Sequence, residues 1–175
     1  MVGNDIIDLS AAKTESNWQR KGWMRKLFSA EEILCISNNH HPEMLVWLYW
    51  SMKEAAYKIY NRKSGKNFFA PLSFICNITH TDKTSAIGQV KFEEDLYYTQ
   101  SVMNEKYIHT VAKTNESDCV NIFLNQNTKA ILPSHLSLNK CNKDLPYLLN
   151  NNTAKACIAS KSHHGIYEAI IYCDQ

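Results

Sequence analysis

Glu54 and Lys58 are the two charged residues whose spacing and surroundings most strongly indicate chemistry. They are four positions apart, so in a helix they share one face, and the residues from 44 to 60 around them are mostly apolar. A helix that is apolar nearly all round is a buried one, and buried charges are costly unless they are paired or bind a ligand. The pair is therefore either an internal salt bridge or part of a functional site.

Further carboxylates lie near the N-terminus, in the sequence Val-Gly-Asn-Asp-Ile-Ile-Asp-Leu at 2–9. Its apolar residues predict a short strand, in which Asp5 and Asp8 point to opposite faces. Asp5 and Glu54 together offer hard oxygen ligands, which Mg²⁺ prefers, and Mg²⁺ commonly adds water and substrate phosphates. We therefore predict a Mg²⁺ site at Asp5 and Glu54 for a phosphate-bearing substrate, and we expect Asp8 to cap the next turn.

These segments resemble the paired signature of the 4′-phosphopantetheinyl transferases, roughly G-x-D-x-x-(D/E) and (F/W)-x-x-K-E-A-x-x-K. The chain has Gly-Asn-Asp-Ile-Ile-Asp at 3–8 and Trp-Ser-Met-Lys-Glu-Ala-Ala-Tyr-Lys at 50–58. Ser-Lys-Ser-His at 160–163 resembles the family's Ser-x-(S/T)-His segment, and Asp-Leu-Pro-Tyr-Leu at 144–148 resembles the stretch before it. The motif order is that of the short, single-module holo-acyl-carrier-protein synthases. The resemblance covers about the first 60 and the last 35 residues.

The resemblance implies a Mg²⁺-dependent transferase that moves the 4′-phosphopantetheine arm of coenzyme A to a serine of an acyl carrier protein or related carrier domain. The by-product would be adenosine 3′,5′-bisphosphate. Mg²⁺ bound by Asp5 and Glu54 would clamp the pyrophosphate, and Lys58 would contact a phosphate as a point charge. His163 would bind a phosphate oxygen or orient the attacking hydroxyl. Glu54 or a metal-bound water would act as the base.

Ser162 and Lys53 complete the set of residues that we expect to bind coenzyme A. The short type often has an arginine where this chain has Tyr49. The phosphate contact of that arginine would therefore fall to Lys53, Lys58 or Lys161, the nearby cations.

The chain also departs from the two-module type, which often has a carboxylate where this chain has Ile7. That difference favours a metal site with fewer protein ligands. If the Ser-x-(S/T)-His resemblance has no functional meaning, His163 is a surface histidine at a turn before a strand. We expect His164 to face solvent. Two other functional classes stay open: a non-catalytic relative that binds a carrier protein or coenzyme A, and another Mg²⁺-dependent phosphotransferase or hydrolase.

Four cations lie within residues 16–27, which we expect to be helical despite the glycine at position 22. They are Arg20, Lys21, Arg25 and Lys26. Acyl carrier proteins are acidic, and the resemblance places a basic helix here to receive them, so complementary charge would mainly raise the association rate. The alternative is a solvated basic face with two tryptophans in the core.

Composition agrees with an ordinary intracellular domain. The 175 residues are 45% hydrophobic and 21% charged, near the globular average, and they can bury a core of their own. The net charge of +2 is too small to indicate a nucleic-acid partner. Membrane spans are not expected, and Asp5 and Asp8 interrupt the N-terminal apolar run that a signal peptide needs. The cysteines form no C-x-x-C pair, so we expect reduced thiols in a cytoplasmic protein.

The residue pattern predicts one α+β domain over 1–175, in which an antiparallel sheet packs on a long buried helix. Ser29 and Glu32 fit a capping box that opens a short helix, and the long helix is expected over 43–62. Strands are predicted at 2–7, 72–79, 86–93, 95–103, 106–113, 119–124, 155–159 and 166–173. Residues 139–152 are polar and are predicted to be loop.

The resemblance also implies an oligomeric state. Members of the short type are typically trimers that bind coenzyme A between subunits, and we expect a homotrimer here. The β-rich middle around 66–140 makes this chain longer than that type. Its strands at 87–113 could instead supply, within one chain, the wall that a neighbouring subunit supplies in the trimer.

Overall fold

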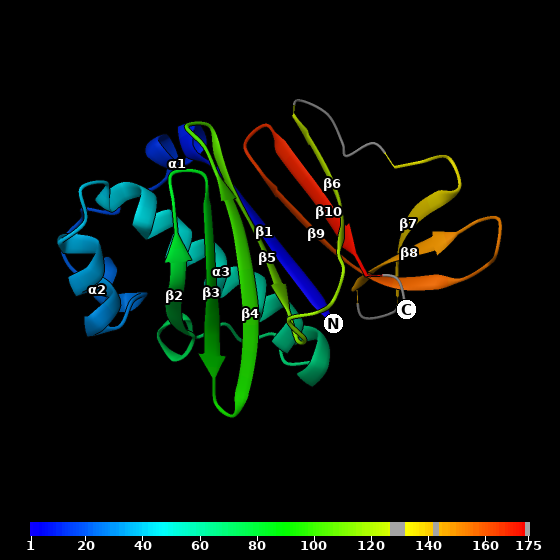
Figure 1. Ribbon diagram of the computed structural model, residues 1–175, viewed down its shortest axis with the longest axis horizontal. Coiled ribbons are helices and arrows are strands. Elements are labelled where there is room, and N and C mark those ends of the chain that lie inside the picture. The colour runs from blue at the N-terminus through cyan, green and yellow to red at the C-terminus, as the bar shows by residue number, and fades with distance from the viewer. Residues whose placement is uncertain (127–131, 142–143, 174–175) are drawn as a thin grey trace.

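The computed structural model describes residues 1–126, 132–141 and 144–173, and it contains two five-stranded antiparallel sheets (Figure 1). The first sheet consists of β1 (Val2–Asp8), β2 (Ile75–Thr81), β3 (Ser85–Phe92), β4 (Asp95–Met103) and β5 (Tyr107–Lys113). The second consists of β6 (Asn121–Gln126), β7 (Leu136–Lys140), β8 (Pro146–Asn150), β9 (Ala156–His164) and β10 (Tyr167–Tyr172). The strand orders are β1-β5-β4-β3-β2 and β6-β10-β9-β8-β7, so β1 is an edge strand.

The helices within the described residues are α1 (Leu9–Glu15), α2 (Ala30–Ser37), α3 (Pro42–Ser64) and the short 3₁₀ helices η1 (Met24–Lys26) and η2 (Pro71–Ser73). α3 begins at a proline, whose fixed φ suits a first turn, and it ends at Gly65 with a left-handed φ of 68°. α2 opens with the predicted capping box of Ser29 and Glu32. No helix in the described part of the chain is long and apolar enough to cross a membrane.

The main core lies between α3 and the first sheet. α3 contacts β1 and β5 most extensively and runs behind the sheet in Figure 1. Its buried side chains include Val46, Met52 and Ile59, and nearby Phe74 and Phe92 stack with ring centroids 4.2 Å apart. The expected α+β class, with antiparallel strands and a long packed helix, is confirmed.

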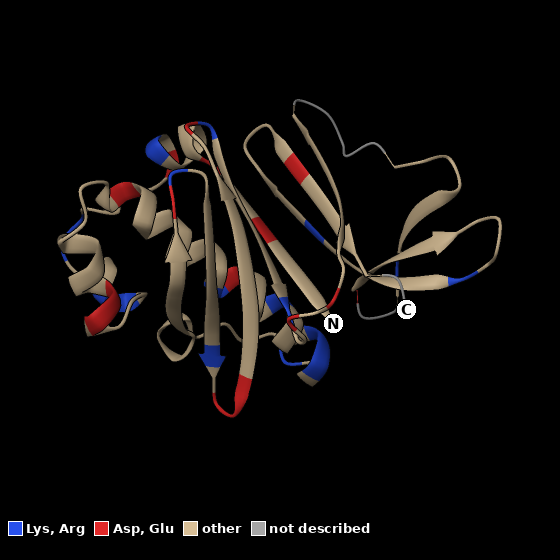
Figure 2. Cartoon of the chain, in the orientation of Figure 1, with Lys and Arg blue, Asp and Glu red and all other residues tan. Residues whose placement is uncertain are grey.

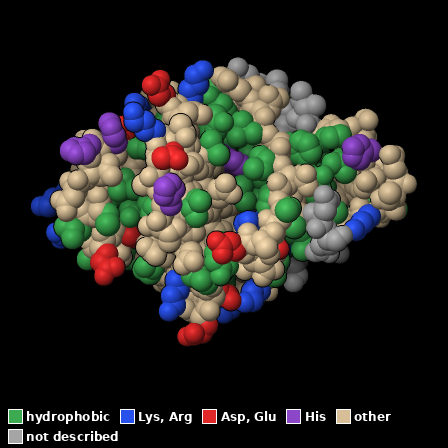
Figure 3. Space-filling model, in the orientation of Figure 1, with side chains coloured by type: hydrophobic (Ala, Val, Ile, Leu, Met, Phe, Trp, Pro, Cys, Tyr) green, Lys and Arg blue, Asp and Glu red, His purple; other side chains and the backbone are tan. Residues whose placement is uncertain are grey.

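β1 is covered on both faces although it is an edge strand, because α3 packs on one face and β9 and β10 on the other. Gly3 permits the first contact, since a Cβ at this position would lie 2.2 Å from the Ala55 carbonyl oxygen. On the other face Ile6 packs with Tyr167 and Ala169. Figure 3 shows hydrophobic side chains along the junction of the two sheets. β1 therefore lies between α3 and the second sheet.

The predicted helix over 16–27 is wrong. A helix forms earlier, as α1, because Asp8 Oδ1 accepts hydrogen bonds from the backbone N–H groups of Ser10 and Ala11. Asp8 thus has the capping role expected of it. Gly22 adopts a φ of 80°, which a regular α-helix excludes, and the short η1 follows it.

The predicted loop over 139–152 is wrong at residues 139–140 and 146–150, which belong to strands. β7 pairs with β8, from Leu136 opposite Asn150 to Lys140 opposite Pro146, and residues 142–143 lie outside the described residues. Within the β-rich middle around 66–140, β2 to β5 join β1 in one sheet, and residues 127–131 are likewise not described.

Gly3→Ala should lower the free energy of unfolding by about 3 kcal/mol, because the added methyl group meets a backbone carbonyl that moves only if α3 shifts. Urea unfolding measures the change. Gly22→Ala is the matched control, because its Cβ meets nothing within 4 Å and only the positive φ costs about 1 kcal/mol. Equal losses in the two variants would contradict the close contact of β1 with α3.

Candidate active site

Asp5, Glu54 and Lys58 come together where β1 packs on α3. Alternation along β1 places Asp5 on the same face as Gly3, which is the face against α3. Glu54 and Lys58 lie one turn apart on the facing side of α3. Lys58 Nζ lies 3.5 Å from Asp5 Oδ1, and it donates a 2.6 Å hydrogen bond to the carbonyl oxygen of Asn4. The ammonium therefore bridges the edge of β1 and the Asp5 carboxylate.

The two carboxylates are short of compensating charge. Burial raises the pKa of Glu54 to about 7, with a further contribution from Asp5 and an opposing one from Lys58. Burial also raises the pKa of Asp5, and Lys58 and the Ser51 hydroxyl act in the opposite direction. A cation between the carboxylates would favour their charged forms.

The residues present fit a Mg²⁺ ion. Within the described residues no group of three or more His, Cys, Asp or Glu side chains could hold a metal, but Mg²⁺ commonly takes one or two carboxylates and completes its shell with water and phosphate oxygens. Ser51, one turn before Glu54 on α3, adds a buried hydroxyl that faces the Asp5 carboxylate and lowers its pKa. Asp5 and Glu54 are therefore the residues that would hold the ion.

Lys53 does not belong to this group, contrary to the prediction that it binds coenzyme A. Its side chain is fully buried and forms an ion pair with Glu32 at 2.9 Å. The ammonium also donates to the carbonyl oxygens of Pro71 at 2.9 Å and Phe74 at 2.5 Å. All three of its protons are used inside the core, so we remove Lys53 from the candidate site.

The predicted C-terminal residues lie on β9 and divide between its two faces. Ser162 is buried against β1, where its hydroxyl accepts a 3.0 Å hydrogen bond from the Asn4 side chain. Strand alternation sends Lys161 and His163 to the opposite face. Lys161 pairs with Glu168 at 2.6 Å, and His163 is exposed. Ser162 is therefore bound within the protein, while His163 is open to a ligand.

Three polar residues near Asp5 carried no motif signal. Asn4 is fully buried and contacts both sheets, and Ser51 is described above. His109 on β5 is buried, and desolvation, followed by the charge of Lys58, lowers its pKa to about 4. The only signal for His109 in the sequence was its place within a predicted strand, and this did not indicate a partner.

We expected His164 to face solvent, but the structure differs. Its side chain connects the end of β9 to Asp8 and Glu15 near the N-terminus. Its Nδ1 accepts a 2.9 Å hydrogen bond from the Asp8 backbone N–H. Its Nε2 lies 3.1 Å from a carboxylate oxygen of Glu15, so Nε2 carries the proton. Asp8 Oδ2 in turn accepts from the backbone N–H of Ile166 at 3.1 Å.

A cavity of about 150 Å³ lies beside Lys58, between α3 and the second sheet. It is lined by Val2, Tyr57, Lys58, Asn61, Arg62, Asn67, Leu145, Pro146, Ser160 and Lys161. Three of these residues are cationic and none is acidic, so the cavity favours an anionic group. Arg62 forms part of its wall by donating to the carbonyl oxygens of Pro146 and Ala159, at 2.7 and 2.6 Å.

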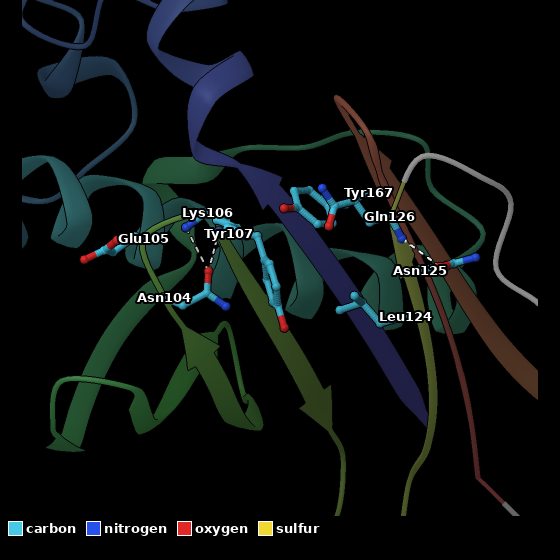
Figure 4. A pocket seen from close by; sticks show the side chains of 8 residues that line it. All are labelled: Asn104, Glu105, Lys106, Tyr107, Leu124, Asn125, Gln126 and Tyr167. Carbon is cyan, nitrogen blue, oxygen red and sulfur yellow. Dashed lines mark hydrogen bonds between the residues drawn. The ribbon is translucent and has the colours of Figure 1, made fainter.

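A larger hollow, of about 620 Å³, lies elsewhere between the sheets (Figure 4). Its lining residues are Asn104, Glu105, Lys106, Tyr107, Leu124, Asn125, Gln126 and Tyr167. The ring centroids of Tyr107 and Tyr167, two of these lining residues, are 5.0 Å apart. The hollow contains none of the residues predicted to do chemistry, so the smaller cavity beside Lys58 is the better candidate despite its size.

The four cations of segment 16–27 are all exposed. They lie in turns and in η1 and not in a regular helix, and Figure 2 shows basic residues beside α2, at the end of the molecule remote from the second sheet. Trp18 and Trp23 are partly buried and pack on the main core. The tryptophans anchor the segment, while its charges remain in solvent.

Comparison with known proteins gives one family. The model of the 4′-phosphopantetheinyl transferase superfamily matches residues 1–112 of this chain. The match includes Asp5, Glu54 and Lys58 and nearly all of the first sheet, and it ends before the second sheet. No curated protein matches the chain.

Lys53→Met should lower the free energy of unfolding by about 3–5 kcal/mol, because it leaves the Glu32 carboxylate buried and unpaired. Lys63→Met is the matched control: its ion pair with Asp95 is largely exposed and should contribute less than about 1 kcal/mol. Chemical denaturation of both variants measures the difference. Lys53→Met should still bind coenzyme A when folded, and a selective loss of that binding would return Lys53 to the site.

Proposed function

Because the chain belongs to the 4′-phosphopantetheinyl transferase superfamily, we propose that it transfers 4′-phosphopantetheine from coenzyme A to a serine of an acyl carrier protein. The reaction is Mg²⁺-dependent and releases adenosine 3′,5′-bisphosphate, as in the holo-acyl-carrier-protein synthase type. The observation that carries the proposal is the convergence of Asp5, Glu54 and Lys58 at the contact of β1 with α3.

The chemistry is attack of an alcohol on a pyrophosphate phosphorus. A bond forms from the serine oxygen to that phosphorus, the bond to the adenosine bisphosphate oxygen breaks, and the hydroxyl proton passes to a base. Mg²⁺ bound by Asp5 and Glu54 supplies charge neutralisation of the pyrophosphate. Lys58 contacts a phosphate from the wall of the cationic cavity, and exposed His163 binds a second phosphate oxygen or orients the hydroxyl.

Glu54 is one candidate to receive the serine proton. Burial raises the pKa of Glu54 to about 7 in the absence of a cation, and Mg²⁺ held by this carboxylate would lower that pKa again. The same carboxylate is proposed to hold the metal, so a metal-bound water remains the other candidate base. A non-catalytic binding relative and a different Mg²⁺-dependent phosphotransferase are the alternative functions.

Asp5→Asn and Glu54→Gln should each reduce transfer at least about 10²-fold while the fold is kept, because each removes a charged ligand and little packing volume. The assay incubates the protein with coenzyme A, Mg²⁺ and an apo carrier protein, and mass spectrometry follows the carrier. Glu31→Gln, at an exposed carboxylate, is the matched control. Near-normal turnover in either site variant would exclude the metal assignment, and no mass gain with the unmodified protein would favour an alternative function.

The basic segment is proposed to receive the acidic carrier protein. Arg20, Lys21, Arg25 and Lys26 are exposed and attached to the core by two tryptophans, which gives a fixed cationic surface. Opposite charges raise the association rate and lose effect as salt is added.

Replacing all four of these cations with Glu should raise the KM for the carrier protein at least about tenfold and leave coenzyme A binding unchanged, because opposite charge no longer steers the encounter. Steady-state kinetics at several salt concentrations measure this, and the rate of the unmodified protein should fall with salt. Lys83→Glu with Lys91→Glu is the control, at one exposed position in the β2–β3 turn and one on β3. An unchanged KM together with salt-independent kinetics would refute the docking role.

The homotrimer and the cytoplasmic location stay predictions, as does the absence of a nucleic-acid partner. The second sheet bears on the assembly, because it covers β1 within one chain. The strands at 87–113, which were the alternative to a wall from a neighbouring subunit, belong to the first sheet with β1. If one chain encloses coenzyme A, the second sheet supplies the wall.

A further inference from the structure

Asn4, next to Asp5 on β1, is fully buried and its side-chain amide joins the two sheets. The amide nitrogen donates to Ser162 Oγ at 3.0 Å and to the carbonyl oxygen of Ala169 at 3.3 Å, both on the second sheet. It also lies 3.2 Å from His109 Nε2 on β5 of the first sheet. One side chain therefore contacts three strands.

The backbone of Asn4 is held in the same way. Its N–H donates to Ser160 Oγ on β9 at 3.0 Å, and its carbonyl oxygen accepts the 2.6 Å hydrogen bond from Lys58 on α3. These are the groups that an edge strand leaves unpaired. The position of Lys58 is thus linked, through Asn4, to the position of β9.

A second attachment lies four residues further along β1. The Asp8 N–H bonds to His164 and the Asp8 carboxylate bonds to the N–H of Ile166, at 2.9 and 3.1 Å. Asp5 lies between the two attachments, on the opposite face of the strand. The β9–β10 hairpin therefore holds β1 on both sides of Asp5.

We propose that Asn4 is a positioning residue for the metal site, which holds β1 against the second sheet so that the Asp5 carboxylate and the Lys58 ammonium keep their places. This rests on the proposed function in taking Asp5 and Glu54 as the metal ligands. Residues that orient ligands from behind commonly change metal affinity 10- to 100-fold when they are replaced.

The chemistry of the amide supports this role over simple packing. Asn4 Oδ1 is buried with no hydrogen-bond partner in the described parts of the chain, which is unfavourable. An apolar side chain of the same size would avoid that cost, but it could not donate to Ser162 and Ala169. The unpaired Oδ1 lowers the stability of the fold, while the Nδ2 hydrogen bonds to Ser162 and Ala169 connect the two sheets in a fixed direction.

Asn4→Leu tests the proposal, because it keeps the size of the side chain and the backbone hydrogen bonds and removes the amide. Calorimetry on the protein saturated with coenzyme A should show Mg²⁺ affinity at least about 10-fold weaker. The kcat for transfer should fall about 10²-fold with an unchanged KM for the carrier protein, because misplacement affects the reacting groups and not docking. Val90→Ala, at a buried position of β3, is the control for lost stability alone and should keep the Mg²⁺ affinity.

Ser162→Ala removes the hydrogen bond between Asn4 and Ser162 from the side of the second sheet. This variant replaces Asn4→Leu as the test if Asn4→Leu does not fold. It should also weaken Mg²⁺ binding. The double variant should lose less Mg²⁺ binding free energy than the sum of the two single losses, because both substitutions remove the same hydrogen bond. Wild-type Mg²⁺ affinity and kcat in a folded Asn4→Leu or Ser162→Ala protein would overturn the proposal. Asp5→Asn distinguishes a failure of the Asn4 proposal from a failure of the proposed metal site. If Asp5→Asn also keeps the Mg²⁺ affinity, the metal site itself is misassigned.

Discussion

The contact of α3 with β1 at Gly3 is the constraint on which the rest of the structure depends. The carbonyl oxygen of Ala55 approaches Gly3 so closely that no larger residue fits. Glu54 immediately precedes Ala55, and Lys58 follows it by three positions, so the contact sets both of them against Asp5. Backbone touching backbone leaves no rotamer freedom between the two elements. Such rigidity suits a site whose groups must stay within a fraction of an ångström.

The features that sequence could predict are local or periodic. Helical spacing alone puts Glu54 and Lys58 on one face, and the capping box and the positions of the main strands along the chain follow from short patterns. Lys53 shows where charge without geometry misleads. It is adjacent to Glu54 in the motif, but successive residues are about 100° apart around a helix, and the structure places Lys53 in the core with Glu32.

The second sheet and the role of Asn4 depend on contacts that no local pattern encodes. The side-chain and N–H partners of Asn4 are between 105 and 165 residues away in sequence. β7 and β8 are five residues each, and their asparagines and lysine are typical of loops. The helix prediction for segment 16–27 was wrong for a different reason. Asp8 caps a helix that ends at Glu15, and the positive φ of Gly22 excludes a regular helix through segment 16–27.

The position of β1 at the start of the chain has a consequence for how the protein is made. β1 pairs with β5, which ends at Lys113, and is covered by β9 and β10, which end at Tyr172. During synthesis from the N-terminus, this strand leaves the ribosome long before either partner exists. Pairing across such separations is slow, because loop-closure entropy is lost before the contacts form. The unpaired N–H and C=O groups of such a strand are also a template for pairing with another chain, so the nascent chain is more vulnerable to aggregation than the finished fold.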